Sequence, residues 1–397
     1  MSYTDAKVEF HIIQSFPTSC LNRDDVGTPK SSVIGGVRRA RLSSQSQKRE
    51  IRSAMYEMGL EIGTRSTRLR QMIEDAVRAR LEMNAPGAED NEQKAAYCGE
   101  FIASTLVKEE KGSAQEGNGE ESEQRDTENK TLVFLSNREI EVIAEKLEEH
   151  NFVPEDMVIA GFSKANREKF EGKSQKERTD EAHNKALSMI ENLLKKEHAY
   201  DSAMDIALFG RMVAKATDLN VEGAASFAHA ISTHRSEPEI DFFTAVDDLK
   251  ESQGAAHMGA TEHTSATFYR YVCINISDLQ KLYSGLSVNE AIERFTKALF
   301  AAVPQGRQST MAAHSVWDYA RVLVRKGQPI QASWDAPVKS NGEGFSKPSI
   351  ERLKQFIDNA EVSIGSLYGK VGDLEWTGGN GYSIDELASD NIAVESL

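Results

Sequence analysis

The segment from Gly35 to Arg52 concentrates basic side chains in a chain whose formal net charge is −15. Two glycines open it, a basic run with the character of a strand follows, and a cluster of serines and glutamines precedes Lys48. The segment holds one acid, Glu50, and six basic residues: Arg38, Arg39, Arg41, Lys48, Arg49 and Arg52. This arrangement favours a site for a polyanion, and the natural use is recognition of a nucleic-acid backbone.

The cluster of serines and glutamines predicts a helix start. If Ser44 caps the helix, the first-turn N–H groups can face a phosphate together with three side chains, those of Ser43, Gln45 and Gln47. Lys48 and Arg52 then share one helix face, because they stand four residues apart. The alternative is that the basic residues form an ordinary solvated surface, since runs of charge are common.

The acidic residues gather elsewhere in the chain. Residues 89–128 hold 12 acidic and 4 basic residues. Residues 237–251 hold 6 acidic residues and 1 basic residue, and residues 372–397 hold 6 acidic residues and no basic one. The rest of the chain therefore carries +4, and the basic segment lies within it. A pI near 5.2 does not exclude nucleic acid as a partner, because the electrostatic requirement concerns a patch and not the total charge.

Length and composition predict a soluble, cytoplasmic protein of two or three domains, or of one domain with large insertions. The chain has 397 residues, of which 39 % are hydrophobic, and it shows neither an apolar run of membrane-spanning length nor a signal peptide. Its cysteines, Cys20, Cys98 and Cys273, are scattered and form no CxxC pair, so we expect neither disulfides nor a zinc site. No cofactor is indicated.

Hydrophobic periodicity predicts an α+β fold. Lys7–Ile13 alternates as a half-buried strand, a loop with Pro17, Gly27 and Pro29 follows, and a helix through Ile51 and Met55 ends near Gly59. The other expected elements are helices within 66–111 that break at Pro86–Gly87, a capping box at Ser136 and Glu139, a helix over 174–198, a strand over Thr267–Ile276, a helix over Val288–Ala302 and a strand over Val316–Val324. The order strand, helix, strand, helix, strand, with a helical insertion, favours a ferredoxin-like sheet of the kind found in RNA-recognition domains.

Other residues with chemical potential give weaker indications. The adjacent acidic residues Asp24 and Asp25 could serve a metal-dependent RNA-cleaving centre. Acidic residues in a loop, however, more often stabilise turns or form salt bridges with basic residues. His257, Glu262 and His263 have no zinc-site spacing. Without a nucleophile motif or a metal motif, we expect a protein that is not an enzyme.

Consecutive aromatic residues, Phe242 and Phe243, stand among acids in a segment that reads as a strand. Neighbouring residues of a strand point to opposite faces, so only one of the two rings can readily be buried. The other ring is free to wedge against a nucleobase, because stacking on an aromatic side chain tolerates any base.

The motifs as a set resemble the CasC family, the backbone subunits of the type I-E CRISPR surveillance complex, Cascade. The matching residues are Ser19–Asp25, Gly35–Gly36, Arg38–Arg41, Ser43–Ser46, Lys48–Arg49, Asp205–Met212, Ala228–Ile231, Asp241–Asp248 and Phe268–Tyr271. Residues 1–60 and 200–310 resemble the family closely, whereas the helical insertion and the C-terminal part do so loosely.

The resemblance implies a hand-like protein. Its discontinuous palm, similar to an RNA-recognition domain, would comprise residues 1–60 and 251–397, its helical fingers 61–200 and its thumb hairpin 201–250. The acidic stretch 112–130, which the resemblance does not cover, reads as a disordered linker. Tyr269 and Tyr271 are expected to be core or sheet residues and not base-stacking residues.

The resemblance also implies the ligands and the partners. The guide CRISPR RNA (crRNA) would lie against Arg23, Arg38, Arg41, Ser43, Ser44, Gln45, Lys48, Arg49 and Arg52, and the residues that wedge a base would be Met212, Phe243, Thr244 and Val246. Further copies of the chain would form a helical filament along the crRNA with the other Cascade subunits, which are the large subunit, the small subunit, the 5′-end cap and the crRNA-processing subunit. Target DNA would bind through base pairing with the guide, and no membrane is involved.

Two alternatives remain open at the level of sequence. One is a related RNA-targeting backbone subunit in which Asp24 or Asp25 cuts RNA with a divalent metal. The other is a stand-alone RNA chaperone, which would be a monomer that requires no guide.

Overall fold

A computed structural model describes residues 6–107, 131–246, 255–340, 342–379 and 381–390. The predicted linker 112–130 lies outside the described residues. The chain divides into two compact units. The first comprises residues 1–60, 224–281 and 286–397, and the second comprises 61–223 and 282–285. None of the helices in the described part of the chain has the length and apolar character needed to cross a bilayer.

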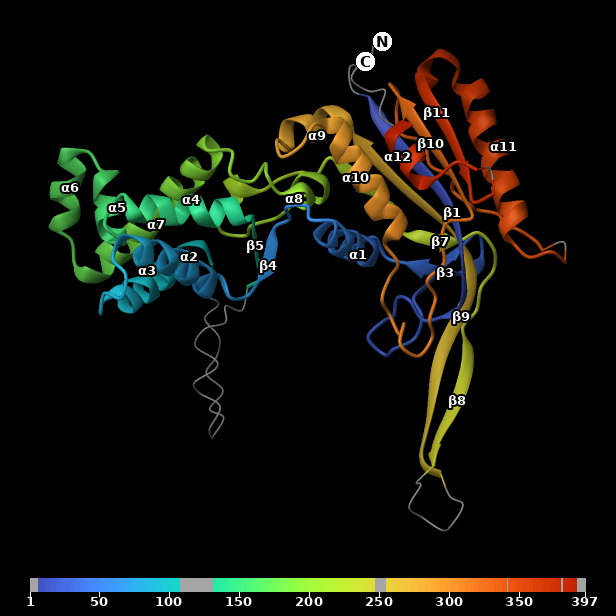
Figure 1. Ribbon diagram of the computed structural model, residues 1–397, viewed down its shortest axis with the longest axis horizontal. Coiled ribbons are helices and arrows are strands. Elements are labelled where there is room, and N and C mark those ends of the chain that lie inside the picture. The colour runs from blue at the N-terminus through green and yellow to red at the C-terminus, as the bar shows by residue number, and fades with distance from the viewer. Residues whose placement is uncertain (1–5, 108–130, 247–254, 341, 380, 391–397) are drawn as a thin grey trace. The chain divides into compact units, whose positions relative to one another are not determined.

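The first unit contains an antiparallel sheet with the strand order β11-β10-β1-β9-β7-β3-β2, and β6 and β8 pair with β9 outside this path (Figure 1). Its strands are β1 (Lys7–Ser19), β2 (Ser31–Ile34), β3 (Val37–Leu42), β6 (Ala225–Phe227), β7 (Ala230–Ser232), β8 (Glu239–Val246), β9 (Ala255–Asn275), β10 (Tyr319–Arg325) and β11 (Lys370–Thr377). Its helices are α1 (Ser44–Glu57), α9 (Ile276–Leu282), α10 (Val288–Ala301), α11 (Ser346–Ile364), η2 (Gly365–Tyr368) and α12 (Ile384–Asp390), and only the end of α9 belongs to the second unit. The predicted α+β class is confirmed.

Strand β1 is buried on both faces, which corrects the prediction of a half-buried strand. Phe10 packs edge-on against Phe295 of α10, whereas Ile13 belongs to the core that α11 closes from the other side of the sheet (Figure 1). Glu9 and His11, which the alternating pattern assigns to solvent, are fully buried because α11 and the segment before it cover them. Pro17 lies within β1 and not in a loop.

A buried network satisfies these polar groups. Glu9 accepts hydrogen bonds from Arg325 Nη1 at 2.5 Å and from Tyr271 Oη at 2.8 Å, and Tyr269 Oη lies 2.9 Å from His11 Nδ1. Burial is the main cause that lowers the pKa of His11 to about 3. The ring is therefore neutral at physiological pH.

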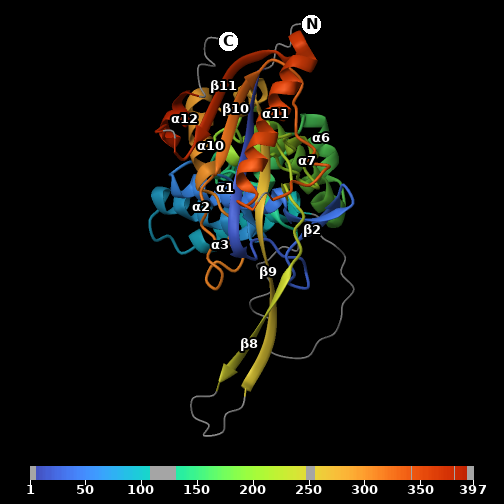
Figure 2. The same cartoon turned by 90° about the vertical axis from the view of Figure 1, so that its right-hand side faces the viewer.

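The hairpin formed by β8 and the first part of β9 projects from the sheet (Figure 2). Phe243 pairs with Gly259, and the Phe243 ring covers the place where a glycine Cβ would stand. Phe242 points to the other face and is 75 % exposed, against 44 % for Phe243. The predicted exposure of at least one ring is confirmed, and the more exposed ring is that of Phe242.

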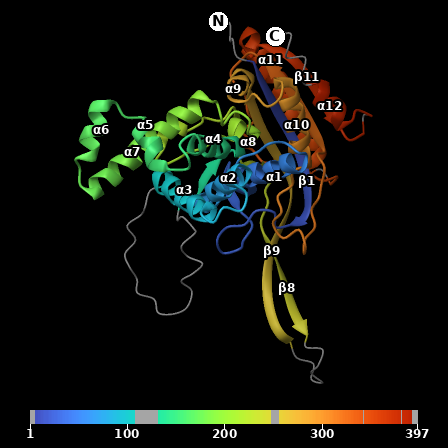
Figure 3. The ribbon, with the colours of Figure 1, turned by 60° about the vertical axis from the view of Figure 1, so that its left-hand side comes forward.

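The second unit is mainly helical, as predicted (Figure 3). Its helices are α2 (Leu69–Asn84), α3 (Asn91–Leu106), α4 (Asn137–Glu148), α5 (Pro154–Ala160), α6 (Lys164–Glu171), α7 (Gln175–Lys196), α8 (Met204–Phe209) and η1 (Thr217–Leu219), and its strands β4 (Thr64–Ser66) and β5 (Val133–Leu135) pair with each other. The break at Pro86–Gly87 separates α2 from α3, and Ser136 and Glu139 form the predicted capping box of α4.

Glycine at position 35 is required by a close approach of two backbones. Gly35 has φ +58°, and a Cβ there would lie 1.8 Å from the carbonyl oxygen of Asp335. Gly36 has φ +76° but no atom of the described residues within 4 Å of such a Cβ. The turn between β2 and β3 is thereby held on the segment that precedes α11.

We expect Gly35→Ala to lower the unfolding free energy by about 2–4 kcal/mol, because backbone strain and a collision act together. Gly36→Ala is the matched control and should cost about 1–2 kcal/mol, since only the left-handed backbone is strained. Urea denaturation followed by circular dichroism measures both. Equal midpoints for the two variants would contradict the contact between Gly35 and Asp335.

Candidate nucleic-acid interface

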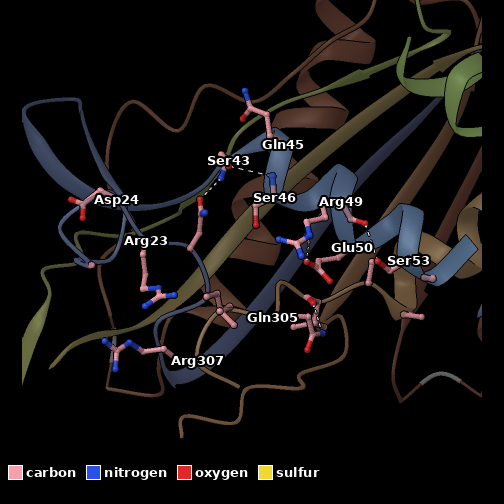
Figure 4. Close-up of a pocket in the computed structure, with 18 of the residues that line it drawn as sticks. Arg23, Asp24, Ser43, Gln45, Ser46, Arg49, Glu50, Ser53, Gln305 and Arg307 are labelled. Atoms are coloured by element: carbon pink, nitrogen blue, oxygen red, sulfur yellow. Dashed lines mark hydrogen bonds and ion pairs between the residues drawn. The ribbon is translucent and has the colours of Figure 1, made fainter. Parts of the chain in front are cut away.

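A cleft of about 1140 Å³ lies at the start of α1 in the first unit (Figure 4). Three segments form its walls: the loop after β1, one face of α1 along its length, and the end of α10 with the loop that follows. The polar and charged residues that line it are Asn22, Arg23, Asp24, Asp25, Ser43, Gln45, Ser46, Arg49, Glu50, Ser53, Glu57, Gln305 and Arg307.

The start of α1 is fixed by local hydrogen bonds and by one from the loop after β1. Ser43, and not the predicted Ser44, is the N-cap, and its Oγ accepts from Ser46 N at 3.3 Å. Asn22 Oδ1 accepts from Ser43 N at 2.9 Å, so the loop after β1 is tied to the helix cap. The first-turn N–H groups at Ser44 and Gln45 have no acceptor inside the helix and carry the positive end of its dipole.

Four of the predicted guide-binding residues line this cleft. They are Arg23, Ser43, Gln45 and Arg49. The Arg49 side chain is 83 % exposed, and its Nε lies 4.0 Å from a Glu50 carboxylate oxygen. Burial raises the pKa of Glu50, with Arg49 acting in the opposite direction. The cleft therefore presents a helix start and exposed cationic side chains to one volume, an arrangement that binds anions.

The other predicted guide-binding residues lie outside the lining of the cleft. Ser44 begins α1, Lys48 and Arg52 lie further along the helix, and Lys48 Nζ stands 5.1 Å from the centre of the Phe227 ring. Arg38 is exposed on β3, and Arg41 Nη1 lies 3.1 Å from His229 Nδ1. Burial is the main cause that lowers the pKa of His229, followed by Arg41 and Lys30.

Two polar residues of the basic segment have structural contacts. Arg39 is fully buried and donates to the carbonyl oxygens of Ser232 and Trp334, both at 2.9 Å. The expectation that Gln47 faces a phosphate is wrong: Gln47 is buried, donates to Ala228 O and accepts from Arg270 Nε at 3.2 Å. Burial lowers the pKa of Arg270 to about 10.

The sheet face beneath α11 is closed to a ligand. Tyr269 and Tyr271 are 1 % and 5 % exposed, and they share a core with Leu353 and Ile357 of α11. Their predicted role as core residues is confirmed. Base stacking on this face, the usual mode of RNA-recognition domains, is excluded by α11.

The residues expected to wedge a base occupy two regions. Phe243, Thr244 and Val246 lie on β8 of the projecting hairpin, where Thr244 pairs with Met258. Met212 belongs to the second unit, is 80 % exposed, and lines a pocket of about 440 Å³ beside Arg65.

The acids of the loop after β1 have a local structural role. Asp24 Oδ1 accepts from Val26 N at 3.1 Å and from Thr28 N at 2.9 Å, which closes the turn. Within the described ranges, no three His, Cys, Asp or Glu side chains come together in a way that could bind a metal ion. All three cysteines are buried and free.

Sequence reasoning missed Arg307 and Gln305. Both lie on the loop between α10 and β10, which has no hydrophobic period and is far from α1 in the sequence. A polar run after Pro304 was the only signal, and it indicates a loop without indicating where the loop packs.

Solved structures include chains whose fold is similar to that of this chain. A chain of a structure described as "CRISPR RNA-guided surveillance complex, pre-nicking" is similar to this chain, with a TM-score of 0.69, 25 % identity, and coverage of 98 % of this chain and 99 % of that chain. A chain of a second "CRISPR RNA-guided surveillance complex" has a TM-score of 0.61 and 21 % identity over 96 % of this chain and 94 % of that chain. No curated protein matches the sequence.

Residues 8–390 match the model of the CT1975-like protein family, a family of CRISPR-associated proteins. Because the match covers nearly the whole chain, the protein belongs to this family. The type I-E branch, expected from the sequence, is a narrower assignment than this family.

Proposed function

We propose that the chain is a non-catalytic backbone subunit of a type I-E CRISPR Cascade complex, which binds crRNA along its phosphates and presents it to target DNA. The observation that carries the proposal is the cleft at the start of α1, where Arg23, Arg49 and the Ser43 cap meet in one volume. The similarity to chains of RNA-guided surveillance complexes supports the same ligand. Base pairing would then read the target, and the protein would read only the shape of the backbone.

The first unit supports the proposed palm. Its elements β1, α1, β7, β9, α10 and β10 follow the βαββαβ order of a ferredoxin-like sheet. With the sheet face covered by α11, the phosphates have to be held at the edge, where α1 starts. The second unit would supply the fingers, and the β8–β9 hairpin the thumb that reaches a further copy of the chain in a filament.

The proposed ligand can be tested by binding single-stranded RNA across a salt series. Electrostatic contacts with phosphates give an affinity that falls steeply with salt and depends little on sequence. An affinity that is insensitive to salt, or that requires one base sequence, would contradict backbone recognition.

One observation favours a second candidate, a metal-dependent endoribonuclease, because Asp24 and Asp25 line the same cleft. The hydrogen bonds of Asp24 to Val26 and Thr28 favour the structural role instead. Incubating the assembled complex with complementary RNA and magnesium separates the two functions, since only the nuclease gives evenly spaced cuts. Asp24→Asn combined with Asp25→Asn should leave guide binding intact.

The proposed wedge predicts a change in RNA geometry without a change in charge. In the variant Met212→Ala with Phe243→Ala, we expect a nearly unchanged salt dependence of binding, because neither side chain is charged. Chemical probing of the bound guide should lose its periodic pattern of exposed nucleotides, since apolar side chains insert between bases. Phe242→Ala is the control on the opposite hairpin face, and a periodic pattern in the double variant would contradict the wedge.

A further inference from the structure

The loop between α10 and β10 brings an arginine into the cleft from outside the basic segment. Figure 4 shows Arg307 on this loop and Arg23 on the loop after β1, and both residues line the cleft. Both guanidinium groups also affect the thiol of Cys20. Burial raises the pKa of this thiol, and the positive charges of Arg307 and Arg23 lower it.

Neither guanidinium is used inside the protein. Among the residues that the structure describes, the side chains of Arg23 and Arg307 form no hydrogen bond or ion pair, and Arg307 Nε is buried without a partner. Arg78, Arg80 and Arg321 each contact two carboxylates. In a chain with 62 acidic and 47 basic residues, two arginines of one cleft that have no carboxylate partner indicate an anionic ligand from outside.

The loop holds Arg307 in a backbone conformation that side chains rarely adopt. Its φ is +52°, and Arg307 O accepts hydrogen bonds from Thr310 N at 3.1 Å and Met311 N at 2.8 Å. A Cβ on Gly306 would lie 2.5 Å from Leu21 O, so the loop is pressed against the segment that leads to Arg23. A strained backbone conformation persists only where the surrounding contacts hold it in place, and such conformations are common at binding sites.

We propose that Arg307 and Arg23 together hold one phosphate of the guide backbone from the side of the cleft opposite α1. Arg307 is then a guide-binding residue outside the basic segment, and the guide is held from two sides. This inference rests on the proposed function, because it takes the anion to be a backbone phosphate of RNA. The planar guanidinium fork matches two phosphate oxygens, and the unpartnered Nε supplies a further donor.

The test measures binding of a 30-nucleotide single-stranded RNA to the full chain and three variants at position 307. We expect Arg307→Ala to bind roughly tenfold more weakly at low salt and to lower the slope of log K against log salt by about 0.7, the value for one phosphate contact in a single strand. Arg307→Lys should keep the slope and lose part of the affinity.

Arg307→Asn should weaken RNA binding while the melting temperature stays equal or rises, because Asn tolerates positive φ. Arg294→Ala, an exposed arginine of α10 outside the cleft, is the control and should change nothing.

Three outcomes overturn the inference. Unchanged affinity and slope in Arg307→Ala, while the unaltered chain binds RNA, would leave the proposed function standing and remove Arg307 from the site. Loss of affinity only in parallel with a lower melting temperature in all three variants would make Arg307 a residue that shapes the loop. Absence of RNA binding by the unaltered chain would contradict the proposed function itself.

Discussion

Alanine at both Arg23 and Arg49 is expected to weaken the binding of single-stranded RNA roughly 50-fold at low salt and to lower the salt slope by about 1.4, twice the single-strand value for one phosphate. The two residues reach the cleft from opposite walls, one from the loop after β1 and the other from α1. Both side chains are exposed, so the fold should be unaffected. Filter binding at four or more salt concentrations, with circular dichroism of each variant, measures both effects.

A matched double variant distinguishes the effect of the cleft arginines on RNA affinity from the effect of net charge. Arg178→Ala with Arg294→Ala removes the same charge from exposed positions that neither line the cleft nor belong to the predicted guide-binding residues. If the two double variants lose equal affinity, RNA responds to net charge and not to the cleft. If only the cleft variant is impaired, the predicted roles of Lys48 and Arg52 can be tested by the same measurement.

Arg211→Met is expected to lower the unfolding free energy of the second unit by about 3–5 kcal/mol, because it leaves the Glu139 carboxylate buried without its cation. Arg211 and Glu139 are fully buried and form two hydrogen bonds, Nη1 to Oε2 at 2.5 Å and Nη2 to Oε1 at 2.6 Å. Arg211 also donates to the carbonyl oxygens of Phe134 and Leu219. Because Met212 follows directly, the same contacts fix the backbone of a proposed wedge residue.

Urea unfolding of the single variants and of Arg211→Met with Glu139→Leu measures this pair. The double variant should be more stable than Arg211→Met alone, since it leaves no unpaired buried charge. Additive losses in the double variant would show that the two groups contribute independently and would contradict the account.

Local patterns in the sequence were sufficient to predict the main elements. The capping box at Ser136, the end of α1 near Gly59 and the break at Pro86–Gly87 depend on residues within a few positions of one another, and all three are confirmed. The start of α1 was misplaced by one residue, because Ser43 and Ser44 are equally good caps and only Asn22, from another loop, decides between them.

Long-range packing could not be predicted from these patterns. Glu9 and His11 alternate with apolar residues as exposed positions would, and they are buried only because α11, more than 300 residues later, covers that face. Gln47 faces Arg270 for a similar reason. Arg307 enters the cleft because Gly306 packs on Leu21, a contact that leaves no local signature.

We propose that several copies of this chain hold one guide RNA by its backbone. The most direct test is to purify the tagged chain from cells that also make its partner subunits and a guide, and to measure the RNA content and the mass of the particle. We expect one guide RNA with several copies of the chain, and loss of that RNA when Arg23 and Arg49 are both replaced by alanine. A monomer that leaves the cell without RNA in the presence of its partners and guide would contradict the claim.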